Sequence, residues 1–212
     1  MPADDYCFSH TTPPDKILDA VERWAHLHTV QPQMVCGPYE GRLLTMLASM
    51  LDARLAVEFG TFVGYSAICI ARGLSDDGVL HTFEVNDEYQ EAITNHINSA
   101  GVSSKVQLHI GDAAVLFPRL MLQSPQKIDL AFIDAGKRQL RDHYEMVLPF
   151  MRSGGIVVVD NVLWGGKVLD ADSLHDADTR GINAFNDFVR NDQRVENVML
   201  NVRDGLLLCR VL

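Results

Sequence analysis

The stretch Val57–Ser66 reads VEFGTFVGYS and carries the strongest fold signal in the chain. It begins inside a short apolar run, Leu55–Phe59, and contains two glycines, Gly60 and Gly64, before a helical pattern starts at Tyr65. A short apolar strand, a glycine loop and a helix, in that order, open a βαβ unit. Because glycine lets the backbone approach a ligand closely, the loop is also a candidate binding site.

The rest of the chain repeats this alternation of strand and helix patterns, which indicates a parallel sheet covered on both faces. Strands are predicted at Leu55–Phe59, Val79–Glu84, Val106–Ile110, Ile128–Ile133, Ile156–Asp160, Val195–Asn201 and Leu206–Val211. Helices are predicted at Asp15–His28, Tyr39–Leu51, Tyr65–Gly73, Asp87–Ala100, Ala113–Leu122, Arg138–Met151 and Thr179–Asn191. The dipeptide Asp204-Gly205 favours a hairpin turn, so the final strand should run antiparallel to the one before it.

The composition predicts a soluble protein with one domain, 1–212. Acidic residues outnumber Lys and Arg by 28 to 18, and the net charge of −10 opposes binding to nucleic acid. No apolar run reaches the roughly 18 residues of a membrane span, and the acidic start Met1–Asp5 is not a secretory signal. The four cysteines form no Cys-x-x-Cys pair and the histidines lack zinc-ligand spacing, so we expect a reducing cytoplasm and no structural zinc.

Acidic or glycine-rich residues follow five successive predicted strands. In chain order they are the loop 60–64, Glu84, Gly111-Asp112, Asp134 and Asp160-Asn161. Ligands of open α/β sheets bind outside the carboxyl ends of the strands. The convergence of these residues on one rim is therefore the main functional signal of the sequence.

The residues at the ends of the first two predicted strands favour the binding of a nucleoside that has no pyrophosphate. The spacing Gly60-x-x-x-Gly64 departs from the Gly-x-Gly-x-x-Gly of dinucleotide sites, and Glu84 lies 20 positions after Gly64. An acidic residue at the second strand end accepts hydrogen bonds from ribose hydroxyls. S-adenosylmethionine, which has a ribose and no phosphate, suits this pattern better than NAD or FAD. The alternative is a tight turn without a ligand, with Glu84 as a solvated charge.

The later strand ends favour a hard cation. Asp134, Asp160 and Asn161 offer oxygen ligands, which suit Mg²⁺ and leave positions for water or substrate oxygens. Lys137 follows Asp134 by three positions, and a lysine beside a bound cation loses its proton more easily, so it is a candidate general base. The alternative is that Asp160-Asn161 is only a turn and Lys137 a surface charge.

These residues resemble the cation-dependent O-methyltransferases, a family that includes caffeoyl-CoA O-methyltransferase, bacterial relatives and, more distantly, catechol O-methyltransferase. The similarity runs from about Met34 to the C-terminus. It is carried by four segments: Val57–Ser66, Phe132–Lys137 (FIDAGK), Val159–Val168 (VDNVLWGGKV) and Asp204–Leu208 (DGLLL).

The resemblance implies a Rossmann-like, doubly wound sheet of about seven strands, a homodimer, and an N-terminal helical segment, 1–52, that forms a lid or dimer contacts beside a core of 53–212. The S-adenosylmethionine pocket would be lined by Met34, Glu58, Gly60, Ser66, Glu84 and Ala113, together with Asp134. The cation, Mg²⁺, Mn²⁺ or Ca²⁺, would be held by Asp134, Asp160 and Asn161. Lys137 would be the catalytic base, with Asp134 as its catalytic partner.

The chain departs from the family where Gly136 replaces a frequent Asp, and where Leu140 and His143 replace frequent tyrosines. These changes affect the expected substrate pocket, in which His143 is a pocket or surface residue and not a catalyst. The segment Leu163–Thr179 is expected to form a loop over the acceptor.

The function expected is divalent-cation-dependent methyl transfer from S-adenosylmethionine to a hydroxyl of a catechol-like small molecule. The alternatives are an S-adenosylmethionine-binding protein without catechol activity and a methyltransferase for another class of small acceptor. A nucleotide-dependent oxidoreductase is disfavoured because the phosphate fingerprint is absent. A nucleic-acid amino-methyltransferase is disfavoured because the chain has no Asn/Asp-Pro-Pro-Tyr/Phe motif.

Overall fold

The computed structural model describes residues 3–123, 126–170 and 176–212. The chain divides into two compact units, Met1–Leu116 and Phe117–Leu212, and each is described by itself. The helix α6 (Ala113–Met121) crosses the point of division. The expectation of one domain, 1–212, with a helical segment 1–52, stays a prediction.

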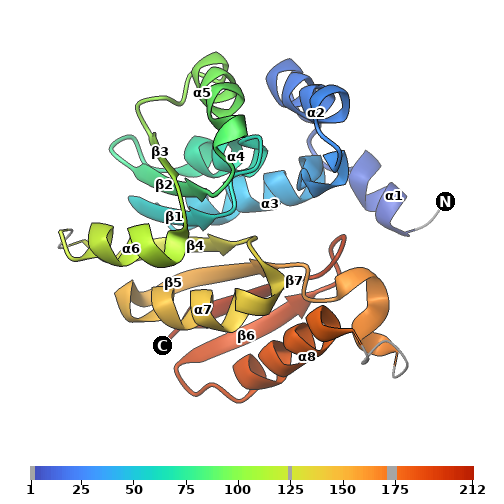
Figure 1. Ribbon diagram of the computed structural model, residues 1–212, viewed down its shortest axis with the longest axis vertical. Helices are drawn as coiled ribbons and strands as arrows, with labels where there is room; N and C mark the ends of the chain where they lie inside the picture. The colour runs from blue at the N-terminus through green and yellow to red at the C-terminus, as the bar shows by residue number, and fades with distance from the viewer. Residues whose placement is uncertain (1–2, 124–125, 171–175) are drawn as a thin grey trace. The chain divides into compact units, whose positions relative to one another are not determined.

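The first unit contains three parallel strands, β1 (Leu55–Phe59), β2 (Val79–Glu84) and β3 (Val106–Ile110), in the order β3-β2-β1 (Figure 1). All five residues of β1 are buried, which is why its sequence is a continuous run and not an alternating one. The register pairs Phe59 with Phe83, so the carboxyl ends of β1 and β2 lie side by side.

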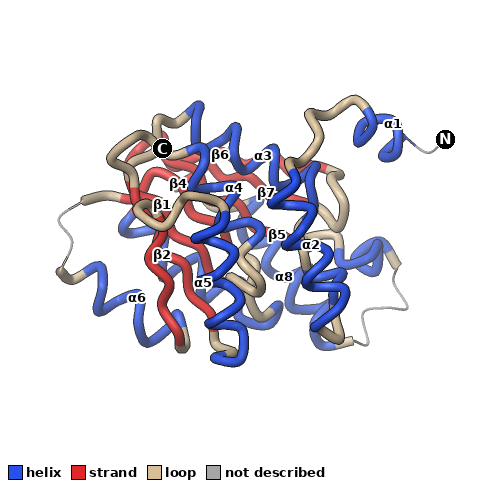
Figure 2. Tube along the Cα trace, turned by 90° about the horizontal axis from the view of Figure 1, so that it is seen from above, coloured by secondary structure: helices blue, strands red, loops and turns tan. Residues whose placement is uncertain are grey.

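Helices lie against these strands (Figure 2). One apolar cluster packs between them. It joins α2 (Lys16–His28), α4 (Tyr65–Gly73) and α5 (Gln90–Ser99) to residues of β3. The other helical elements of the unit are α1 (Ala3–Ser9), η1 (Pro32–Met34), α3 (Gly37–Met50) and η2 (Asp87–Tyr89). The sequence did not predict α1, and it predicted η2 and α5 as one helix.

The sequence predicted a helix that begins at Asp15. In the structure Asp15 precedes α2 and is its N-cap. Its Oδ1 accepts hydrogen bonds from the backbone N–H groups of Ile17 and Leu18, at 3.1 and 3.0 Å. A side-chain oxygen there satisfies N–H groups that have no partner within the helix. Arg72 of α4 lies 2.8 Å from the same carboxylate, so the cap also ties α2 to α4.

Two histidines on neighbouring strands, His81 of β2 and His109 of β3, share a hydrogen bond of 3.0 Å between Nδ1 and Nε2. Burial, and then the proximity of His109, lower the pKa of His81 to about 4; burial also lowers the pKa of His109. Unfolded histidine titrates near 6.5. As the pH falls, the histidines of the unfolded chain therefore take up protons before those of the folded protein do. The stability that the neutral pair contributes is complete above about pH 6.5 and is lost as the pH falls towards 4.

We expect His81→Gln to lessen the loss of unfolding free energy between pH 7 and pH 4.5, measured by urea unfolding at each pH. Other titrating groups contribute equally to both proteins, so the difference between them isolates the pair. His26→Gln, at an exposed position of α2, is the control. If His81→Gln follows the same pH dependence as the wild-type chain, this account of the pair is wrong.

The second unit contains β4 (Ile128–Ile133), β5 (Met151–Asp160), β6 (Val195–Leu200) and β7 (Leu206–Val211), in the order β4-β5-β7-β6. The pairing of β4 with β5 is parallel, whereas β7 is antiparallel to both β5 and β6, as the hairpin signal predicted. Strand β5 begins earlier than predicted because Met151 pairs with Ile128 before the register shifts. The helical elements are η3 (Lys137–Gln139), α7 (Leu140–Val147), η4 (Leu148–Phe150), η5 (Trp164–Leu169) and α8 (Ala177–Arg190).

The complete strand order, β3-β2-β1-β4-β5-β7-β6, is that of a seven-stranded, mostly parallel sheet, and the predicted α/β fold class is confirmed. Among the described residues, no helix is both long and apolar enough to cross a membrane.

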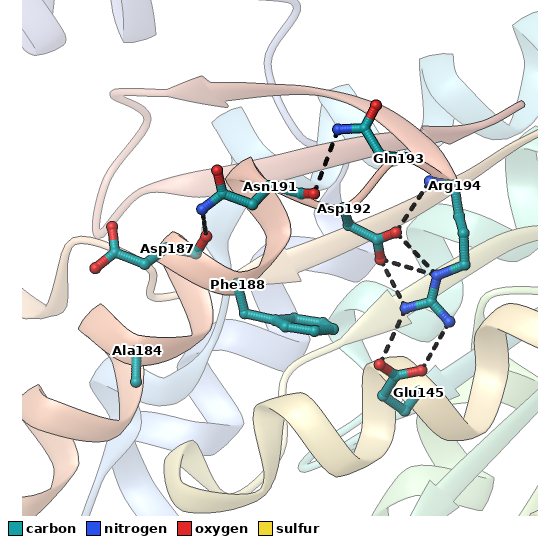
Figure 3. Close-up of a pocket in the computed structure, with 8 residues that line it drawn as sticks. All are labelled: Glu145, Ala184, Asp187, Phe188, Asn191, Asp192, Gln193 and Arg194. Atoms are coloured by element: carbon teal, nitrogen blue, oxygen red, sulfur yellow. Dashed lines mark hydrogen bonds and ion pairs between the residues drawn. The ribbon is translucent and has the colours of Figure 1, made fainter.

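A salt-bridge network connects the end of α7 to the residues that follow α8 (Figure 3). The guanidinium of Arg194 contacts Glu145 at 2.9 and 3.0 Å and Asp192 at 2.7 Å, and the hydroxyl of Tyr144 donates to Asp192 at 3.0 Å. These hydrogen bonds, first that from Arg194, lower the pKa of Asp192 to about 2. The network borders an open hollow lined by Glu145, Ala184, Asp187, Phe188, Asn191, Asp192, Gln193 and Arg194. Lys137 precedes the start of α7, so the hollow lies at the other end of that helix.

Candidate functional site

The loop after β1 has a backbone that few residue types adopt. Gly60, Phe62 and Gly64 have φ values of 99°, 49° and 89°, in the left-handed region that favours glycine. The N–H of Gly60 donates to the carbonyl of Phe83 at 3.0 Å, and Gly64 caps the start of α4. The two predicted glycines are therefore required by the path of the chain from strand to helix.

Glu84 ends β2 and holds this loop. Its Oε2 accepts from the N–H of Phe62 at 2.7 Å, and its Oε1 accepts from the N–H of Asn86 at 2.9 Å. The side chain is buried, and each oxygen keeps a further lone pair. The structure thus brings Glu84 and the glycine loop together, as the nucleoside hypothesis requires. The role of Phe62 was missed, because its contribution is a backbone N–H and not its side chain.

Glu58 reaches the same loop from within the sheet. It is fully buried, and its Oε2 accepts a 2.6 Å hydrogen bond from the hydroxyl of Thr82, which also hydrogen-bonds to Thr61. Two more of the predicted pocket residues are buried in the first turns of helices, Ser66 in α4 and Ala113 in α6. Met34 lies at the end of η1 with half of its side chain exposed, outside this hydrogen-bond network.

These residues of the first unit fit the adenosine part of S-adenosylmethionine. A strand-end carboxylate is the group that ribose hydroxyls require, and the left-handed glycines keep side chains out of the loop at two positions. The fit therefore rests on the acceptor chemistry of Glu84 and on the loop.

The second unit brings together the four residues of the predicted cation site. Asp134 follows β4, Asp160 ends β5, Asn161 comes next, and Lys137 begins η3. The ammonium of Lys137 donates to Oδ1 of Asp134 at 2.8 Å and to Oδ1 of Asn161. Burial, and then the nearby Asp134 carboxylate, raise the pKa of Asp160 to about 7. The two predicted segments, 24 residues apart, therefore form one site.

This site fits a divalent cation. A positive group, the ammonium of Lys137, already bridges an oxygen of Asp134 and an oxygen of Asn161. Within the described ranges, no group of three or more His, Cys, Asp or Glu side chains could hold a metal, so the predicted set depends on the amide oxygen of Asn161 as its third ligand. Hard oxygen donors of this kind are those that Mg²⁺ and Mn²⁺ prefer.

Asp204, in the turn between β6 and β7, also contacts the site. Its Oδ2 accepts from Nδ2 of Asn161 at 3.4 Å, and its Oδ1 accepts from the N–H of Gly165. The sequence predicted a hairpin at Asp204-Gly205 but no contact with Asn161. No local pattern could reveal it, because 43 residues separate the two side chains.

The segment Leu163–Thr179 was predicted to form a loop over the acceptor. Its first part is a short helical segment, η5, in which Trp164, Gly165 and Gly166 have positive φ values, and its last residues form the start of α8. The indole N–H of Trp164 reaches Asp176 at 3.5 Å, where α8 is capped. Residues 171–175 of the predicted loop lie outside the described residues, and its role over an acceptor stays a prediction.

The positions where the chain departs from its expected family are on or before α7. Leu140 and His143 are both buried, so His143 is not a surface residue. Gly136 precedes η3 and carries no ligand group, and the Asp134–Lys137–Asn161 contacts form with glycine at that position.

Comparison with known proteins identifies the family of the chain. An O-methyltransferase family matches residues 9–212. Tricin synthase 2 of Oryza sativa subsp. japonica is 38% identical over 184 residues, which are 84% of this chain and 63% of that protein. Catechol O-methyltransferase of Niastella koreensis is 33% identical over 185 residues, 85% of this chain and 83% of that protein.

The crystal structure of the O-methyltransferase TomG from Streptomyces achromogenes, in complex with S-adenosylmethionine, has a TM-score of 0.88 at 32% identity and covers 98% of this chain and 95% of that one. The fold and these similarities together place the chain in the class of S-adenosylmethionine-dependent O-methyltransferases. The chain belongs to the O-methyltransferase family.

Proposed function

We propose that this protein transfers the methyl group of S-adenosylmethionine to a hydroxyl of a catechol-like small molecule, with a divalent cation held by Asp134, Asp160 and Asn161. The observation that carries the proposal is the bridge that the Lys137 ammonium makes between Asp134 and Asn161. A positive charge is stabilised at that point by oxygens from two separate stretches of the chain, beside the buried carboxyl group of Asp160.

The residues of the first unit position the donor. Glu84, fixed by the N–H groups of Phe62 and Asn86, binds the ribose hydroxyls, and Gly60 and Gly64 give the nucleoside access to the backbone. Met34, Ser66 and Ala113 line the pocket, as the family resemblance implies. S-adenosylmethionine supplies an already activated methyl group, so the work left to the protein is alignment of donor and acceptor.

The residues of the second unit activate the acceptor. A divalent cation bound there would supply Lewis acidity that lowers the pKa of a substrate hydroxyl. Lys137, whose side chain is 17% exposed, holds its Nζ against Asp134. A cation bound nearby would favour loss of a proton from its ammonium to solvent, and the neutral amine then accepts the hydroxyl proton at Nζ. Two carboxylates and one amide leave room for two vicinal oxygens, which is the reason for proposing a catechol.

The name of one relative supports the same acceptor class, since it is called catechol O-methyltransferase. We also infer a homodimer in which residues of the segment 1–52 contribute to the interface or to a lid. In support, the segment exposes several large apolar side chains, namely Tyr6, Phe8, Leu27, Val30, Met34, Met46 and Met50.

The test combines binding and turnover. Calorimetry with S-adenosylmethionine should give one site per chain, and methyl transfer from labelled donor should occur to a vicinal dihydroxy-aromatic but not to its monohydroxy analogue. Removal of metal by a chelator should abolish transfer, and Mg²⁺ should restore it. Donor binding without transfer to any catechol would leave an S-adenosylmethionine-binding protein or an enzyme for another acceptor. Full transfer in excess chelator would remove the cation from the proposal.

A further inference from the structure

The amide of Asn161 must be turned one way to bind a cation. An asparagine side chain carries one acceptor oxygen and one donor NH₂ group, and only the oxygen is a ligand for a hard cation. A half-turn about the last side-chain bond would present Nδ2 to the site and lose that ligand. Something in the fold therefore has to select the orientation.

The neighbours of Asn161 select it by their chemistry. On one side the ammonium of Lys137, which can only donate, faces Oδ1. On the other side the carboxylate of Asp204, which can only accept when ionised, faces Nδ2 at 3.4 Å. The turned amide would place two donors together and two acceptors together, so both contacts favour the same orientation.

The hairpin that carries Asp204 also supports the backbone of Asn161. Asn161 has a φ of 62°, a conformation that side-chain-bearing residues rarely adopt without support. The next two N–H groups, of Val162 and Leu163, donate to the carbonyls of Gly205 and Asp204 at 3.2 and 2.8 Å. A Cβ at Gly205 would lie 2.4 Å from Cγ of Leu163, so glycine is required for this approach.

We propose that Asp204 is a positioning residue that holds the amide oxygen of Asn161 towards the cation. The inference rests on the proposed function, because it assigns Asn161 as a ligand. Hydrogen bonds of this kind to a ligating side chain orient it and strengthen it as a ligand, and their loss typically lowers metal affinity by roughly 10–100-fold.

The experiment measures Mn²⁺ affinity by electron paramagnetic resonance, which needs no turnover. We expect Asp204→Ala to weaken Mn²⁺ binding by about 10–100-fold. Asp187→Ala, which removes an exposed carboxylate of α8, corrects for the loss of one negative charge and should change the affinity far less. Asp204→Asn preserves the size of the side chain and replaces Asp204→Ala if that variant does not fold. Because the amide introduced by Asp204→Asn can donate as well as accept, it no longer selects Nδ2 of Asn161 as its neighbour, so Mn²⁺ binding should again weaken.

A second background separates positioning from general support of the loop. In Asn161→Asp both side-chain oxygens are ligands, so neither orientation loses one. We therefore expect Asp204→Ala to cause no loss of Mn²⁺ affinity in that background. An equal loss in both backgrounds would mean that the hairpin only supports the loop, and the positioning role would be wrong.

The outcomes also separate this inference from the proposed function. If the wild-type protein does not bind Mn²⁺, with or without S-adenosylmethionine, the cation site itself is refuted. If the wild-type protein binds Mn²⁺ and Asp204→Ala binds it as well as Asp187→Ala does, only the role of Asp204 is refuted.

Discussion

Replacement of Asp160 by alanine is expected to reduce methyl transfer in Mg²⁺ to the level that the wild-type protein shows in excess chelator. Asp160 is one of the two carboxylates among the three proposed ligands, and it is 5% exposed, so solvent-facing side chains cannot take its place. Asp160→Asn, which preserves the shape of the side chain but not its charge, should lose most of the same activity. Turnover of both variants is measured across a Mg²⁺ titration.

Thermal unfolding gives a second measure of the same prediction. A ligand that binds only the folded state at 100 times its dissociation constant stabilises that state by about 2.7 kcal/mol. We expect this Mg²⁺-dependent stabilisation in the wild-type protein and in the control Asp142→Asn, at an exposed position of α7, and none in either Asp160 variant. An Asp160→Ala protein that keeps both its Mg²⁺-dependent activity and its stabilisation would falsify the assignment of this ligand.

Replacement of Lys137 by methionine is expected to lower kcat by roughly 10²–10⁴-fold, the usual contribution of a general base. Affinity for S-adenosylmethionine should be unchanged, because the predicted donor residues other than Asp134 belong to the first unit. Mn²⁺ affinity should not fall, because the ammonium that occupies oxygens of Asp134 and Asn161 in this structure is removed. A combined loss of kcat and of Mn²⁺ affinity would instead indicate a structural role.

The pH dependence and two further variants sharpen this test. If Lys137 accepts the proton, the rise of kcat with pH in the wild-type protein should disappear in Lys137→Met. Lys137→Arg keeps the positive charge but cannot release its proton at working pH, so it should be as inactive as the methionine variant. Lys127→Met, at an exposed position before β4, is the control. An active Lys137→Arg enzyme would show that the charge, and not proton transfer, is what the reaction needs.

Local patterns predicted the bounds of β1, β2, β3, β4 and β7 as the structure has them. All residues of β1 and β4 are buried and nearly all are apolar, whereas β2 and β3 are less buried and carry polar residues between apolar ones. The helix predicted at Asp87–Ala100 divides into η2 and α5, and the one predicted at Arg138–Met151 is only Leu140–Val147. Those limits depend on the local 3-10 turns that flank the helices, which helical periodicity does not report.

The sequence by itself determined the chemical groups at the strand ends, because the carboxyl ends of parallel strands share a rim and each end can be recognised in the chain. It thereby predicted the approach of Glu84 to the glycine loop, and of Lys137 to Asp134 and Asn161. Only the tertiary structure decided how these groups are oriented. The N–H of Phe62 donates to Glu84, 22 positions away, and the amide of Asn161 donates to Asp204, 43 positions away. The direction of a hydrogen bond depends on the partner that folding brings to it, and no spacing along the chain encodes that partner.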